Sequence, residues 1–138
     1  LRGDALHGPL RREVEHLTIR FDGREREVRV LHDTGNGLCE PVSGKPVVVL
    51  ERKAAAFLLG GALPDSTKDA ASLLAALPPG LARRCGLVPY RAVGPEGGLL
   101  LYFGPDSVCP ADGGMLDCVC AVGPQNLGRG AYEGLIGV

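Results

Sequence analysis

Residues 28–36 read VRVLHDTGN, a short apolar segment that ends in a carboxylate, a hydroxyl and a glycine. Alternating apolar side chains predict a β-strand, which would hold the backbone of Asp33 rigidly. Thr34 can lock the following loop by a hydrogen bond. Gly35 has no side chain, so the loop can adopt a positive φ and its N–H can approach the carboxylate. Asn36 either bonds within this loop, lines a cleft or is an ordinary turn residue.

An aspartic protease presents its catalytic acid in this way. Its chemistry needs two carboxylates about 3 Å apart that share one proton, one acting as base toward water and the other as acid toward the peptide carbonyl. The chain has no second Asp-[Ser/Thr]-Gly, and Asp106, Asp112 and Asp117 lie in different sequence contexts. Either Asp33 is an ordinary turn residue, or its partner is Asp33 of a second copy related by a two-fold axis.

Length and composition indicate a single globular domain. The chain has 138 residues and a mass of 14.4 kDa, with 45% hydrophobic and 22% charged residues, which suits one core. A net charge of −1 argues against a general nucleic-acid-binding protein. The 21 glycines and 11 prolines predict many turns, and together with the short apolar runs they favour a β-rich fold.

The start of the chain is expected to be a charged lead-in over residues 1–14, followed by one domain over residues 15–138. Because the first residue is Leu1, we expect the chain to be part of a longer protein. Its longest apolar stretch without charges, Ala70–Ala82, has 13 residues and includes a Pro-Pro pair. A membrane-spanning helix needs about 20 residues, so no such helix is predicted here.

Apolar periodicity and turn residues predict about seven short strands and two or three small helices. The two predicted helices are Lys53–Leu59, and Ser66–Leu77 with Ser66 as its N-cap. The predicted strands cover residues 17–21, 24–31, 46–50, 87–93, 99–103 and 116–122, and residues 131–136 form either a strand or a helical turn. A hairpin turn is expected at Asp22-Gly23. Its tip should project past the core, because arginines on the return strand would share a face with the buried side chains.

The cysteines are odd in number and contain no Cys-x-x-Cys pair, which argues against a disulfide framework and a ribbon-type zinc site. Cys118 and Cys120 would share one face of a strand. One interpretation is a metal or redox centre formed with Cys109. The favoured one is buried free thiols that behave as small apolar residues in a reducing, cytosolic environment. No metal or cofactor is predicted.

Residues 33–49, DTGNGLCEPVSGKPVVV, closely resemble the sporulation sigma-E factor-processing peptidases. The segment RCGLVPY at 84–90 is similar to that family's Arg-x-[Ile/Val]-Pro-[Phe/Tyr] segment, and residues 103–106 and 132–136 look like its later landmarks. The similarity extends from about Val28 to the end of the chain. This sequence departs from the family pattern at His32 and Glu40, and by lacking a closing His-Pro.

The resemblance implies a mainly β, retropepsin-like domain with a closed, barrel-like sheet. It implies an aspartic endopeptidase that works as a homodimer, with Asp33 as the catalytic residue and Thr34, Gly35 and Asn36 supporting the active-site loop. The substrate would be the N-terminal pro-segment of a sporulation sigma factor precursor, and a secreted protein would activate cleavage. A further N-terminal membrane domain would place the enzyme at the cytoplasmic face of the cell membrane, on the mother-cell side of the septum. The alternative is an inactive acid-protease-like binding or scaffold module.

A few further residues have two interpretations. His32 could form an acid–base pair with Asp33, but neighbours on a strand face opposite sides, so a structural role is favoured. Arg84 and Arg91 either pair with an acid or substrate, or lie on the surface, as most arginines do. The segment 135–137 could pass beneath the catalytic loop or belong to a tail helix. Gly94–Gly98 is the best candidate for the tip of a flexible flap.

Overall fold

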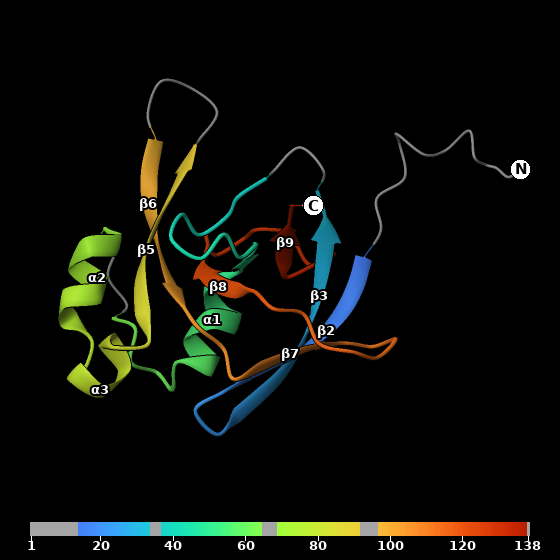
Figure 1. Cartoon of the computed structure of the whole chain (residues 1–138), viewed down its shortest axis with the longest axis horizontal. Coiled ribbons are helices and arrows are strands. Elements are labelled where there is room, and N and C mark those ends of the chain that lie inside the picture. Colours follow the sequence, from blue (N-terminus) through green and yellow to red (C-terminus); the bar gives the residue numbers. More distant parts are fainter. Residues whose placement is uncertain (1–13, 34–36, 65–68, 92–96, 138) are drawn as a thin grey trace, which may run out of the picture.

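The computed structural model describes residues 14–33, 37–64, 69–91 and 97–137. They form one eight-stranded sheet in the order β5-β6-β8-β4-β9-β3-β2-β7 (Figure 1). The strands are β2 (Val14–Phe21), β3 (Arg24–His32), β4 (Val47–Leu50), β5 (Cys85–Arg91), β6 (Gly97–Phe103), β7 (Ser107–Pro110), β8 (Val119–Val122) and β9 (Gly134–Ile136). The predicted mainly β class is confirmed. In the described residues the pairing is linear from β5 to β7, so the sheet is open and not closed into a barrel.

The β2–β3 hairpin turns at Asp22 and Gly23, whose φ values of 51° and 82° are those of the tight turn that matches strand twist. The tip itself, residues 22–25, is exposed, and the core extends along the hairpin as far as Phe21. Phe21 is fully buried, with its ring 4.8 Å from that of Phe103. The Asp22 N–H also donates to Asp106 Oδ2 at 2.8 Å. This hydrogen bond ties the loop after β6 to the exposed hairpin tip.

The centre of the sheet is built from strands far apart in sequence. Strand β9 lies between β3, to which it is parallel, and β4, to which it is antiparallel. Gly134 suits this place, because a Cβ there would lie 3.1 Å from the carbonyl oxygen of Val49 and 3.2 Å from a Val30 methyl. Segment 135–137, which the sequence left undecided, thus belongs largely to a strand beside the end of β3.

Helices α1 (Arg52–Leu58), α2 (Ala70–Ala76) and α3 (Pro79–Ala82) all pack against the larger apolar cluster, and α2 and α3 lie beside β5 at one edge of the molecule. The first agrees with its prediction to one residue at each end: it ends at Leu58, and Gly60, whose φ is 68°, follows its C-cap Leu59. The second begins later than predicted. Its N-cap is Asp69, whose Oδ1 accepts the Ser72 N–H at 2.8 Å, and the assignment of Ser66 as the cap is wrong. Asp69 caps this start because its carboxylate reaches the N–H three residues on.

Strand β4 is buried on both faces, as its unbroken valine run predicts. Val48 and Leu50 join the larger apolar cluster, which includes Leu58 of α1, while Val47 and Val49 join a smaller cluster on the opposite face. Strand β7, which no apolar alternation indicated, pairs with β2 at the sheet edge. Among the described helices none is long and apolar enough to span a bilayer.

Candidate active site

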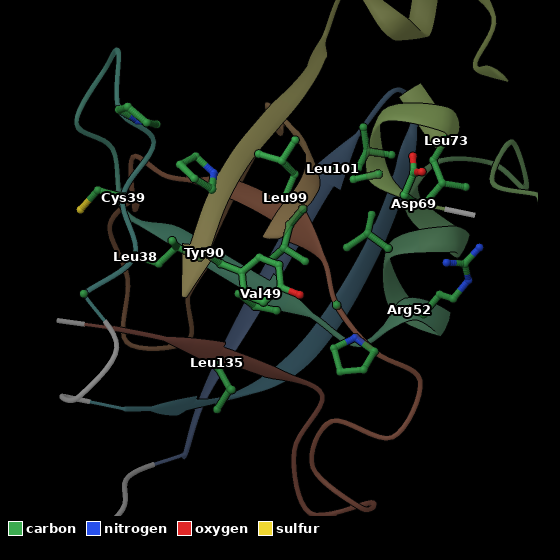
Figure 2. Close-up of a pocket in the computed structure, with 18 of the residues that line it drawn as sticks. Leu38, Cys39, Val49, Arg52, Asp69, Leu73, Tyr90, Leu99, Leu101 and Leu135 are labelled. Atoms are coloured by element: carbon green, nitrogen blue, oxygen red, sulfur yellow. The ribbon is translucent and has the colours of Figure 1, made fainter. Parts of the chain in front are cut away.

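A groove of about 1230 Å³ opens beside the end of β3 (Figure 2). Its walls come from the loop after β3, the β5–β6 hairpin and the start of α2, and it includes side chains of β4 and β9. The residues that line it include Asp33, Cys39, Val49, Asp69, Tyr90 and Leu135. The groove exceeds the roughly 300–1,000 Å³ typical of small-molecule pockets, so it has room for an extended chain.

Asp33 lines this groove and is partly exposed. Strand β9 holds its backbone, because the Asp33 N–H donates to the carbonyl oxygen of Ile136 at 2.8 Å. The preceding residues Leu31 and His32 pair in register with Leu135 and Ile136. The carboxylate predicted from the sequence therefore stands at the end of a strand paired on both sides. Thr34, Gly35 and Asn36 lie outside the described residues.

His32 is engaged away from the groove. Its Nε2 lies 2.6 Å from Glu15 Oε1 on the neighbouring strand β2, and it does not line the cavity that Asp33 lines. This geometry supports a structural role for His32 in the β2–β3 pair rather than an acid–base pair with Asp33.

Glu40 organises the loop that forms one wall of the groove. Its buried carboxylate accepts the N–H groups of Val42 and Ser43 at 2.9 and 2.8 Å, and the Ser43 hydroxyl at 2.7 Å. The bond from the Val42 N–H, with those from Ser43, holds the pKa of Glu40 below its usual value of 4.5. Sequence reasoning noted Glu40 only as a departure from the family pattern. Here it closes the turn that carries Cys39 into the groove.

Of the described residues that line the groove, only Asp33 and Asp69 carry carboxylates. Asp69 is occupied as the cap of α2, and the hydrogen bond from the Ser72 N–H lowers its pKa from the usual 3.8. Leu135 lies on β9, beside the end of β3 that Asp33 follows. In Figure 2, Asp69 and Leu135 lie on different sides of the groove. The described part of one chain therefore does not supply a carboxylate pair at Asp33.

The other acids considered from the sequence do not line the groove. Asp117 lies 3.2 Å from the amine of Lys45, and Asp112 is exposed. Asp106 pairs with Arg84, whose guanidinium also lies 4.2 Å from the centroid of the Phe21 ring. The hydrogen bond from the Asp22 N–H, with that from Arg84, lowers the pKa of Asp106. Arg84 is thus a structural cation, one of the two roles considered; the side chain of Arg91 lies outside the described residues.

Cys118, just before β8, and Cys120, within β8, are both buried free thiols. Their thiols are hydrogen-bonded, which lowers the pKa of Cys118 and raises that of Cys120. Cys109 lies on β7 at the far edge of the sheet, where β8 is not a neighbour. Within the described ranges, no group of three or more His, Cys, Asp or Glu side chains could hold a metal ion. The geometry favours the interpretation as packed free thiols.

The open, mainly β sheet is consistent with an acid-protease-like domain, and it places Asp33 at a groove beside the end of β3. The chain is a member of the Peptidase_U4 family, sporulation factor SpoIIGA, whose family model matches residues 9–136. It is therefore a sporulation protease, as the resemblance at residues 33–49 indicated. No curated protein and no solved structure matches the chain.

Proposed function

We propose that this protease is an aspartic endopeptidase in which Asp33 is the catalytic carboxylate. The observation that carries the proposal is the place of Asp33, at the end of a strand held by β9 and open to the groove. An acid in this position can activate a water molecule against a peptide carbonyl bound in the groove, provided that a second carboxylate shares its proton. Thr34, Gly35 and Asn36 would support the loop.

The second carboxylate would be Asp33 of another copy of the chain. Asp69 is the other groove carboxylate in the described residues, and its oxygen is already committed to the cap of α2. A two-fold axis near the end of β3 would bring two equivalent aspartates together, since a symmetric dimer presents the same surface twice. Each protomer would then contribute one half of the active site.

The proposed substrate is the N-terminal pro-segment of a sporulation sigma factor precursor. Membership of the sporulation factor family supports this substrate, and the size of the groove suits an extended peptide. The antiparallel β5–β6 hairpin would act as the flap. Its predicted tip is Gly94–Gly98, and residues 94–96 of this segment lie outside the described ranges. Attachment at the cytoplasmic membrane face and activation by a secreted protein are part of the same proposal.

The first test is Asp33→Asn, with Asp112→Asn as a matched control at an exposed glycine-rich turn. We expect Asp33→Asn to lower the rate of precursor cleavage at least about a hundredfold, because it removes the acid–base group. The control should cleave at the wild-type rate, and both variants should remain folded by circular dichroism. A fully active Asp33→Asn enzyme would instead support the scaffold alternative.

Asp69→Asn tests where the second acid comes from. The amide still accepts the Ser72 N–H, so the helix cap survives while the ionisable group is lost. If Asp69 is not the second acid, the variant should retain most of its cleavage rate. A loss as deep as that of Asp33→Asn would place both acids in one chain and overturn the two-copy proposal.

A further inference from the structure

We propose that Tyr90 is a specificity-determining residue of the groove, and that Gly98 sets the position of its ring. This inference rests on the proposed function, since it assigns the contact to the peptide substrate. Tyr90 on β5 and Gly98 on β6 are direct cross-strand partners in the hairpin. A Cβ on residue 98 would lie 2.7 Å from Tyr90 Cε1 and 3.0 Å from Tyr90 Oη. The far end of the ring therefore lies directly over the glycine.

The ring is placed where a substrate would touch it. Tyr90 projects from β5 into the middle of the groove (Figure 2) and stays partly exposed. It is the only aromatic side chain among the described residues that line the groove, which it shares with Asp33, Val49 and Leu135. A rigid aromatic surface beside an apolar wall offers a large contact area to an apolar or aromatic substrate side chain.

Gly98 is explained by this arrangement. A glycine inside a strand weakens the strand, and its usual reason is the close approach of another group. Here that group is the ring, and an aromatic side chain that covers a cross-strand glycine restores buried contact to the pair. With alanine at residue 98 the ring would have to swing away, because real Cβ atoms do not approach other atoms to 2.7 Å. The glycine thus fixes the ring position without touching the substrate.

The same hairpin contains an internal control. Gly86 on β5 pairs with Tyr102 on β6, and a Cβ on residue 86 would lie 2.7 Å from the Tyr102 ring. The local geometry is therefore the same as at the first pair. Tyr102, however, packs with the smaller apolar cluster and does not line the groove. Gly86→Ala reproduces the steric change in the hairpin at a ring that does not itself line the groove.

The experiment measures kcat and KM for the sigma factor precursor with the full chain carrying each substitution. We expect Tyr90→Ala to lower kcat/KM about tenfold or more, mainly through KM, since it removes a binding contact common to ground and transition states. Tyr90→Phe should stay within about threefold, because the ring and not the hydroxyl makes the contact. Gly98→Ala should resemble Tyr90→Ala, whereas Gly86→Ala should lower activity only as far as it lowers the folded fraction.

Two further measurements distinguish a positioning role from a structural one. In the double variant Tyr90→Ala/Gly98→Ala the second change should cost nothing more, because no ring is left to displace. The chain has no tryptophan, so Tyr90→Trp in an Asp33→Asn background places a single indole in the groove. Its emission should shift to shorter wavelength when the precursor binds.

Additive losses in the double variant, a Gly98→Ala enzyme with wild-type kcat/KM, or an indole that does not respond to the precursor would each overturn the role of the pair. If Asp33→Asn abolishes cleavage while Tyr90→Ala leaves kcat/KM unchanged, this inference fails and the proposed function stands. If Asp33→Asn remains active, the proposed function fails whatever the Tyr90 variants do.

Discussion

At the residue scale, one glutamate ties the strand beside the proposed catalytic aspartate to its neighbours. Glu133, next to the start of β9, accepts the Arg29 N–H at 3.1 Å and pairs with the guanidinium groups of Arg29 and Arg26 at 3.3 and 3.2 Å. Partial burial on its own raises the pKa of Glu133, but the hydrogen bonds from Arg29 and Arg26 outweigh it and hold the pKa below 4.5. Glu133 thereby fixes the start of β9, the strand that supports Asp33.

Glu133→Gln should lower the free energy of unfolding by about 1–3 kcal/mol at neutral pH, since it weakens charge-assisted hydrogen bonds and leaves Arg26 half-buried without its counter-charge. The lowered pKa means that this stabilisation is complete above pH 4.5, the ordinary value for Glu, and is lost as the pH falls through the lower folded value. Urea titrations at several pH values should therefore show the two proteins converging in acid.

The control for this prediction is Glu27→Gln, whose side chain on β3 is 65% exposed. Surface changes of this kind stay within about 0.5 kcal/mol. A gap between wild type and Glu133→Gln that widens below pH 4.5 would contradict the assigned role of the carboxylate.

At the element scale, helix α2 depends on its cap more than on its length. It has seven residues, and one of them, Leu73, is buried and lines the groove. Isolated helices this short are unstable in water, so its start must be held by Asp69 and by packing against β5 and β6. The position of this wall of the groove therefore depends on the Asp69 cap as well as on the packing of α2 against β5 and β6.

Asp69→Ala should lower the free energy of unfolding, because it removes the side-chain acceptor that caps the start of α2. Asp69→Asn should keep most of that stability because its amide oxygen can still accept the Ser72 N–H. Chemical denaturation of the two variants measures the difference. Equal stability of Asp69→Ala and wild type would mean that packing alone holds the helix start.

At the scale of the whole molecule, the proposed enzyme is complete only as a pair of chains. If each active site needs one Asp33 from each protomer, activity depends on protomer concentration, because dissociation separates the two halves of the site. Specific activity should therefore fall on dilution below the dimer dissociation constant. A monomer of constant specific activity would contradict the proposed arrangement.

Mixed dimers provide a stricter test of the shared site. Co-refolding equal amounts of wild-type and Asp33→Asn chains should leave about one quarter of the activity of the same total amount of wild-type chain, since only one random pairing in four has both aspartates. Independent active sites would leave one half. The matched mixture of wild type with Asp112→Asn should lose nothing.

Much of the local structure follows from short-range sequence patterns. The alternation at residues 17–21, the Asp22-Gly23 turn and the valine run of β4 each specify a strand or turn without reference to distant residues. The pattern at residues 66–69 fits more than one helix start, with either Ser66 or Asp69 as the cap, and residues 107–110 show no alternation that would indicate β7. The contact that ties the hairpin tip to the rest of the domain depends on Asp106, which is 84 residues away from Asp22.

Residue patterns alone are enough to predict a mainly β domain, the strand that carries Asp33 and, through residues 33–49, the family. The folded chain was needed to show that β9 lies against that strand, that Asp69 caps α2 at the groove and that Tyr90 lies over Gly98. The physical reason is range: strand and turn preferences are set by neighbouring residues, whereas these contacts depend on which distant segments pack together once the apolar faces of the sheet are buried.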